Sequence, residues 1–210
     1  MRKLAILEPL LMFGLIVTYI WWARLGHPRF WIAIPALMFA SHLLHRESPR
    51  ALGFTFDNFR KGFGELFPRF LLIALPLIAV GGMLHTIRLT GLFGAVLEAA
   101  AYLPWGLVQQ YALNGYFLNR LDAAVPSHIS SRLAALLFCL AHAPNPFLMA
   151  ISFPLGWYAT VLYRRTRNLY LLGMAHAAVG TLVFFLAPDS VTHHMRVGPG
   201  WFQPWPGSGR

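Results

Sequence analysis

Three groups of polar side chains interrupt apolar stretches of this sequence. Gln109, Gln110 and Asn114 lie in WGLVQQYALNGYF, His142 lies in LLFCLAHAPNP, and His176 lies in GMAHAAVG. An imidazole can take up and release a proton near neutral pH, and a carboxamide can orient a water or bind a carbonyl group without titrating. These residue types predict one polar pocket, formed by three segments, that either hydrolyses a bond or binds a polar ligand.

The spacing of these residues places several of them on common helix faces. Gln110 and Asn114 are four positions apart, and so are Phe138 and His142, so each pair shares a face. Lipid offers a buried imidazole no hydrogen-bond partner, so a histidine inside a membrane helix points to function. Amide side chains there often only bond a neighbouring helix, a contact of about 0.6 to 2 kcal/mol. Both interpretations stay open for the amides.

The composition predicts that membrane helices position these side chains. Hydrophobic residues make up 57% of the 210 positions and charged residues 11%, against about 25% charged residues in a soluble domain. This excludes a soluble globular protein. A net charge of +10 would suggest a nucleic-acid partner in a soluble protein, but here the basic residues lie between apolar segments, so we expect none. The single cysteine, Cys139, excludes a disulfide within the chain.

The apolar segments predict an all-α, polytopic transmembrane bundle of about seven spans in one domain, residues 1–188. Residues 54–67 place phenylalanines among charges and predict a separate amphipathic helix in the membrane interface. Residues 189–210 are predicted to form an irregular tail that lies loosely at the interface. The predicted spans are residues 4–23, 30–45, 68–85, 91–119, 130–143, 146–163 and 168–187.

The distribution of basic residues predicts the orientation. With the first segment read as a retained span and not as a cleaved signal peptide, twelve of the 17 Lys and Arg residues fall on the side of the N-terminus. Cytoplasmic loops accumulate positive charge, so we expect the N-terminus to be cytoplasmic.

The acidic residues within the predicted spans are not expected to do chemistry. Glu8 lies near the start of the first span, and we expect a structural role for it. Glu98 precedes Gln109 by eleven residues, about 16 Å along a straight helix, which separates it from the amides. No site is assigned to the remaining histidines, which are His27, His42, His45, His85, His128, His193 and His194.

In order and spacing, the polar groups resemble the motifs of the CPBP intramembrane proteases, which include CAAX prenyl endopeptidases and bacteriocin-processing or self-immunity proteins. That family carries Glu-Glu-x-x-x-Arg on one helix, where this chain has Gln109, Gln110 and Asn114. Phe138 and His142 match the family's Phe-x-x-x-His in full.

The family's third motif, His-x-x-x-Asn or Asp, is matched in its first position by His176, while Gly180 stands at the second. The resemblance covers residues 95–185, within a core of residues 91–187. It implies an endopeptidase of the bacterial cytoplasmic membrane that activates a water to cleave a membrane-embedded or prenylated peptide, with either a zinc ion or a glutamate. In this chain the charged pair is replaced by neutral amides, which removes the family's general base but also avoids an unpaired arginine.

Three functions therefore stand as hypotheses. In the first, the protein is an endopeptidase in which neutral His142 or His176 is the base and Gln109 or Gln110 stabilises the oxyanion. In the second, it is a catalytically inactive relative that binds membrane peptides or proteins in the same cavity. In the third, it is a small transporter, which the absence of paired repeats disfavours.

The remaining predictions concern residues around this centre. Asn114, Phe138 and Asn145 are expected to bind substrate or to have structural roles. Two histidines without a carboxylate make a poor metal site, so we expect no cofactor and no tightly bound zinc. The expected partners are membrane lipid and a membrane-embedded or prenylated peptide.

Overall fold

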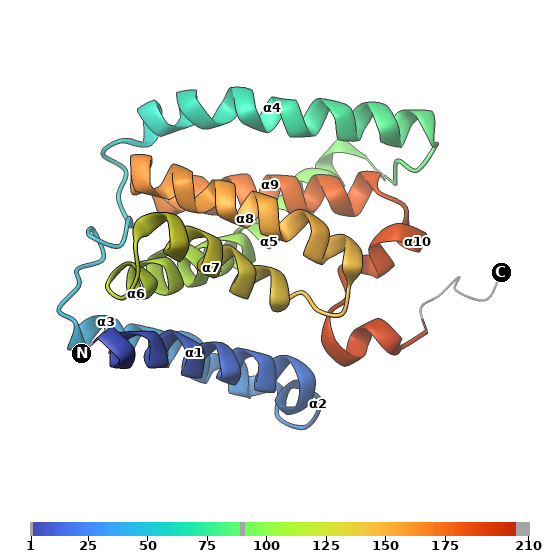
Figure 1. The fold of residues 1–210 in the computed structure, drawn as a ribbon. Helices are drawn as coiled ribbons and strands as arrows, with labels where there is room; N and C mark the ends of the chain where they lie inside the picture. Colours follow the sequence, from blue (N-terminus) through green and yellow to red (C-terminus); the bar gives the residue numbers. More distant parts are fainter. Residues whose placement is uncertain (1, 89–90, 205–210) are drawn as a thin grey trace.

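The computed structural model describes residues 2–88 and 91–204, and every regular element in these ranges is helical, as expected (Figure 1). The long helices lie side by side with their axes nearly parallel. In Figure 1, α4 lies at the top, α5, α7, α8 and α9 form the middle, and α1 and α3 lie at the bottom. The long helices are α1 (Arg2–Thr18), α3 (Ala33–Leu44), α4 (Phe59–Met83), α5 (Leu92–Gln110), α7 (Ser127–Leu140), α8 (Pro146–Thr166) and α9 (Leu169–Leu186).

Shorter helices extend or connect these elements. The π-helix η1 (Tyr19–Ala23) and α2 (Arg24–Gly26) continue α1, and the π-helix η3 (Tyr111–Leu118) and α6 (Asn119–Asp122) continue α5. The other short helices are η2 (Pro28–Ile32), α10 (Asp189–Thr192), η4 (His193–Met195) and η5 (Gly198–Phe202).

The length and surface of the helices identify an integral membrane protein. Four helices are long and apolar enough to cross a bilayer, namely residues 6–26, 59–83, 146–166 and 169–186. Residues 28–44 and 127–140 form shorter apolar helices. Large apolar side chains such as Leu72 and Phe93 are more than 70% exposed. Such a surface is stable in lipid, where it faces hydrocarbon and not water.

Helix α4 corrects one prediction. Residues 54–58 are not helical, and residues 59–67 are the first turns of one helix that continues to Met83. The separate interfacial helix near residues 54–67 is therefore absent. Pro68 and Pro76 lie inside this helix without ending it, since a membrane helix tolerates proline.

Helices α5 and α9 approach each other closely at two glycines. A Cβ on Gly106 would lie 2.7 Å from the carbonyl oxygen of Gly173, and a Cβ on Gly173 would lie 2.9 Å from the Cα of Leu107. Small residues let membrane helices pack backbone against backbone, which is how α5 brings Gln110 within reach of α9.

Replacing Gly173 by alanine is expected to destabilise the protein by about 1 to 3 kcal/mol, because the added methyl group meets backbone atoms that cannot move aside. Thermal unfolding in detergent measures the change. Gly82→Ala is the matched control, since a Cβ at Gly82 in α4 meets no atom within 4 Å. Equal unfolding temperatures for the two variants would contradict the close packing.

A cluster of charges around the buried Arg120 joins α1 and α3 to the core at one end of the bundle. Arg120 is 5% exposed, donates to Glu8 Oε1 at 3.0 Å and to Glu47 Oε2 at 2.7 Å, and also donates to Ser41. Glu8 accepts a further hydrogen bond from the Tyr116 hydroxyl at 3.1 Å. The structural role expected for Glu8 is thus the pairing of two helices through Arg120.

The C-terminal tail is more ordered than predicted. Residues 189–202 form α10, η4 and η5, and these short helices close the end of the bundle opposite the Arg120 cluster (Figure 1). Gly198 N donates to the carbonyl oxygen of Ala143 at 2.8 Å, and Arg24 Nη2 donates to that of Val197 at 3.4 Å. The tail is therefore held by the turn between α7 and α8 and by α2.

Candidate active site

Gln109 and Gln110 lie at the last two positions of α5, where the backbone changes from α-helical to the π-helical geometry of η3. Short π-helical segments are rare and occur often at functional sites, because the wider turn changes the direction of the side chains around it. Gln110 is buried, and Gln109 is partly exposed to a cavity.

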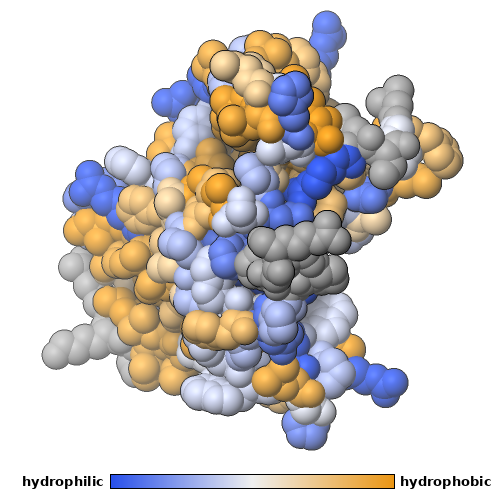
Figure 2. Space-filling view, turned by 90° about the vertical axis from the view of Figure 1, so that its right-hand side faces the viewer, coloured by the Kyte–Doolittle hydropathy of each residue, from blue (hydrophilic) through white to orange (hydrophobic). Residues whose placement is uncertain are grey.

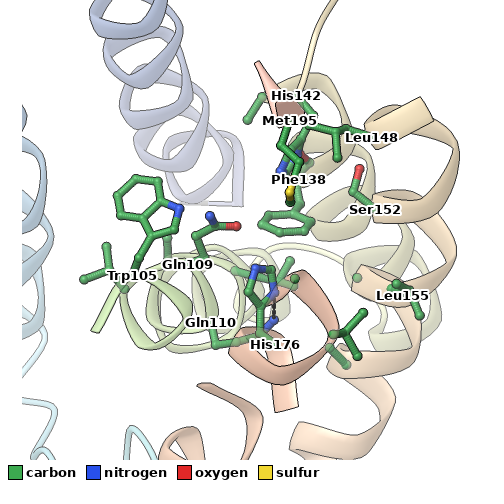
Figure 3. A pocket seen from close by; sticks show the side chains of 18 of the residues that line it. Trp105, Gln109, Gln110, Phe138, His142, Leu148, Ser152, Leu155, His176 and Met195 are labelled. Atoms are coloured by element: carbon green, nitrogen blue, oxygen red, sulfur yellow. Dashed lines mark hydrogen bonds between the residues drawn. The ribbon is translucent and has the colours of Figure 1, made fainter. Parts of the chain in front are cut away.

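A chain of three side chains links η3 to α9. Asn114 Nδ2 donates to Gln110 Oε1 at 2.7 Å, and Gln110 Nε2 lies 3.2 Å from His176 Nδ1 (Figure 3). An amide nitrogen is only a donor, so His176 Nδ1 accepts this bond. A neutral imidazole then carries its proton on Nε2. The amide of Gln110 thus bonds Asn114 through its oxygen and His176 through one of its two N–H donors, so it orients His176.

The imidazole of His142 is oriented by a backbone carbonyl four residues earlier. Its Nδ1 lies 2.7 Å from the carbonyl oxygen of Phe138 and donates to it, so the neutral ring has its lone pair on Nε2. Within the described residues, Nε2 has no hydrogen-bond partner. The Phe138 ring lies between the histidines, with its centroid 4.8 Å from that of His142 and 6.0 Å from that of His176. At Nε2, His142 therefore carries a lone pair, whereas His176 carries an N–H group.

The position of His142 corrects the expectation that it lies inside a helix. Helix α7 ends at Leu140, and His142 lies in the turn before α8. Pro144 and Pro146 follow closely, and a proline disfavours helical geometry in the residue before it. The turn lets the His142 side chain fold back onto the Phe138 carbonyl, four residues earlier.

Gln109 is the amide with unused hydrogen-bonding capacity at the cavity. Its Oε1 is buried and has no hydrogen-bond partner in the described part of the chain. In Figure 3 the Gln109 side chain extends toward the space between His176 and Phe138. A buried carbonyl oxygen without a partner costs about 1 to 3 kcal/mol, so this atom is suited to accept a hydrogen bond from a water or a ligand.

The cavity that holds these groups has a volume of about 1020 Å³ and is lined mainly by apolar side chains. Gln109, Gln110, His142 and His176 all contribute to its wall. Asn114 and Asn145 do not. The structure thus brings together all four residues predicted to do chemistry, places Phe138 between the histidines, and leaves Asn114 as a buried partner of Gln110.

Tyr102 occupies the space that a side chain at position 180 would need. A Cβ on Gly180 would lie 2.6 Å from Tyr102 Cε1, and both residues line the cavity. This accounts for glycine at the position where the resembled family carries Asn or Asp. Sequence reasoning missed Tyr102, because a tyrosine two turns before Gln109 gives no signal in a helix rich in aromatic residues.

Asn145 lies outside the cavity and anchors the tail. It is fully buried, its Oδ1 accepts from Leu148 N at 3.1 Å as the cap of α8, and its Nδ2 donates to the carbonyl oxygens of Thr192 and Arg196 at 2.9 and 3.0 Å. The structure therefore gives Asn145 a structural position. Through it the tail reaches the cavity, where Met195 lies near His142 in Figure 3.

Asn145→Ala is expected to speed hydrogen–deuterium exchange in residues 189–203 several-fold, because both tail hydrogen bonds are lost. Asn168→Ala is a matched control, since Asn168 is equally buried, caps α9 through Leu171 N, and makes its other bonds to Thr55 and Asn58. Each variant loses a cap worth about 1 kcal/mol. Unchanged exchange in the tail of Asn145→Ala would contradict the anchoring role.

The donors at the cavity do not fit a zinc ion. A catalytic zinc is held by three protein ligands drawn from His, Cys, Asp and Glu. The site offers two histidines, His142 and His176. In residues 2–88 and 91–204 no three such side chains are grouped to hold a metal. Gln109 supplies a neutral amide oxygen, a weaker ligand than a carboxylate, so no step is assigned to a metal.

The same segment matches a known family of membrane proteases. Residues 96–182 match the family model described as type II CAAX prenyl endopeptidase Rce1-like. In this segment the chain is similar to the CAAX-protease-like family. The segment runs from α5 to α9, so Gln109, Gln110, His142 and His176 all lie within it. No curated protein and no solved structure matches the chain.

The family segment accounts for only part of the cavity wall. Helices α1, α3 and α4 and the tail lie outside residues 96–182, yet Phe13, Met38, Phe70 and Met195 line the same cavity. The segment that matches the family model thus supplies the polar groups, and the other helices supply much of the apolar enclosure.

Proposed function

We propose that this protein is a membrane endopeptidase that cleaves a membrane-embedded or lipidated peptide, with His142 and His176 acting as a complementary pair. The observation that carries the proposal is the opposite tautomer of the two rings, which the hydrogen bonds from His142 to Phe138 and from Gln110 to His176 support. The orientation with the N-terminus inside a bacterial cytoplasmic membrane belongs to the same proposal.

In this mechanism a water molecule bound to Gln109 Oε1 attacks the carbonyl carbon of the peptide. His142 Nε2 takes a proton from the water as the new C–O bond forms, and His176 Nε2–H donates a hydrogen bond to the developing oxyanion. The protonated His142 then gives its proton to the peptide nitrogen as the C–N bond breaks. The products are a carboxylic acid and an amine, and both histidines return to the neutral state.

Gln110 and Asn114 are positioning residues in this proposal. Their amides fix the tautomer of His176 without placing a charge in a low-dielectric site. In this proposal His176, and not Gln109 or Gln110, stabilises the oxyanion, because Gln110 Nε2 donates to His176. Gln109 keeps a direct role, as the amide that holds the attacking water.

Gln110→Glu is expected to raise the rate of cleavage about tenfold or more, because a carboxylate beside His176 stabilises its protonated form and restores a titratable partner. Cleavage products of a membrane-peptide library, identified by mass spectrometry, measure the rate. Asn119→Asp is the control, since it adds a carboxylate nine residues along the same continuous helix and outside the cavity wall. No change in the Gln110→Glu variant would contradict a place for Gln110 at the reacting centre.

One observation favours a second candidate, a catalytically inactive relative that binds membrane peptides. The cavity and both histidines are retained, while glutamine stands where the resembled family has its glutamates. Binding of peptides by the native protein without any cleavage product, both before and after Gln110→Glu, would support this second function over the first.

A further inference from the structure

Two arginines line the end of the cavity that the tail closes. A Cβ on Gly200 would lie 3.3 Å from Arg24 Nη2 and 3.9 Å from Arg196 Cβ, so the Arg24 guanidinium lies beside the tail close to where the Arg196 side chain begins. Arg24 comes from α2, Arg196 comes from the tail, and both line the cavity. Figure 2 shows this end of the molecule, where hydrophilic residues gather in the centre and hydrophobic residues lie above and to the left.

Neither arginine is neutralised by an acidic residue within the described chain. Arg24 Nη2 donates to the carbonyl oxygen of Val197, and Arg196 Nη1 donates to those of Gln203 and Pro204. These acceptors carry no formal charge, and a guanidinium has five N–H donors, so most of its donors remain for a ligand. Glu98 also lines the cavity, but it is exposed and forms no ion pair with either arginine.

An apolar channel leads away from the two arginines. Phe13, Ile16 and Ile20 line the cavity from the same face of the first helix as Arg24, and Phe13 precedes Arg24 by eleven residues. This corresponds to roughly 16 Å of helix. Met38 and Leu113, from α3 and η3, also line the cavity. The space therefore has a cationic end and a long hydrocarbon-like body.

From this arrangement we infer that the cavity binds an anionic amphiphile, with its carboxylate or phosphate on Arg24 and Arg196 and its apolar chain along the α1 face toward Phe13. Charge-assisted hydrogen bonds from guanidinium to carboxylate or phosphate are among the strongest that proteins form. A neutral head group would leave two partly buried cations without a counterion. The inference does not depend on peptide cleavage, since it concerns binding alone.

The test uses the full chain in nanodiscs of neutral phosphatidylcholine and the fluorescent probe 11-(dansylamino)undecanoic acid. Energy transfer from the tryptophans of the protein reports binding, since Trp31 and Trp105 line the cavity. The matched ligand control is the methyl ester of the same probe, which lacks the negative charge. We expect the acid to bind about tenfold more tightly than the ester.

Protein variants test whether the positive charge of the two arginines determines the affinity for the probe. The double variant Arg24→Gln, Arg196→Gln is expected to lower the affinity for the acid to that for the ester, whereas Arg24→Lys, Arg196→Lys keeps a clear preference for the acid. Arg29→Gln is the protein control, because Arg29 lies at the same end but does not line the cavity. The unfolding temperature of each variant shows that it is folded.

Competing ligands identify the source of the anionic group. Displacement of the probe by oleate alone would support a free fatty acid, and displacement by phosphatidylglycerol as well would support a lipid head group. Equal displacement by neutral monoolein, equal affinity for acid and ester, or an equal loss of affinity in Arg29→Gln would overturn the inference. Each of these results is independent of whether the protein cleaves peptides.

Discussion

A protein that carries His142→Ala is expected to cleave membrane peptides about 10² to 10⁴ times more slowly than the native protein while it remains folded, because a positioned general base contributes a factor of this size. His142 is suited to this role since the Phe138 carbonyl holds its Nδ1–H and leaves Nε2 as the acceptor at the cavity. The loss should appear mainly in kcat, because the base acts on the water and not on the binding of the substrate.

The measurement is the rate at which mass spectrometry detects cleavage products from a membrane-peptide library. His128→Ala is the matched control, since His128 is exposed near the start of α7 and does not line the cavity. The double variant His142→Ala, His176→Ala should be little slower than the single variant, because residues that act as one unit are not additive. Undiminished cleavage by His142→Ala would exclude this histidine as the base.

The second large effect is expected on stability. Arg120→Met should destabilise the protein by about 3 to 5 kcal/mol, because it leaves the carboxylates of Glu8 and Glu47 near each other without their shared cation. Thermal or denaturant unfolding in detergent measures the loss. The cluster joins α1 and α3 to α6, so α1 and α3 should separate before the α5–α9 core unfolds.

Arg50→Met provides the control for Arg120→Met. Arg50 forms an ion pair with Asp57, but both side chains are more than 60% exposed, and an exposed pair contributes at most about 1 kcal/mol. Comparable destabilisation by the two variants would show that the burial of the Arg120 cluster is not what makes it important.

Lowering the pH should reduce the stability that the Arg120 cluster contributes. Glu47 lies in the connection between α3 and α4. Although burial raises the pKa of its carboxyl, hydrogen bonds from Arg120 and His42 and the charge of Arg120 outweigh that effect, so its pKa is lowered. A lowered pKa in the folded state means that ionised Glu47 stabilises the protein above its unfolded pKa. That contribution is lost as the pH falls through the folded pKa.

The sequence by itself determined the class of fold and the residues of the candidate site. An 11% share of charged residues excludes a water-facing surface, and apolar runs of membrane length can satisfy their backbone only as helices. The spacing of four between Gln110 and Asn114 predicted that the two side chains share a helix face, and the two amides are hydrogen-bonded. His142, His176 and Gln109 stood out because lipid offers such groups no partner.

Only the tertiary structure decided how those residues are used, because that depends on contacts between segments far apart in the sequence. It joined Gln110 to His176 across 66 positions and filled the space beside Gly180 with Tyr102. It also placed the Arg24 guanidinium beside Gly200, where the Arg196 side chain begins. No periodicity within one segment encodes such contacts, which arise from the crossing of α5 and α9 and from the return of the tail across the end of the bundle.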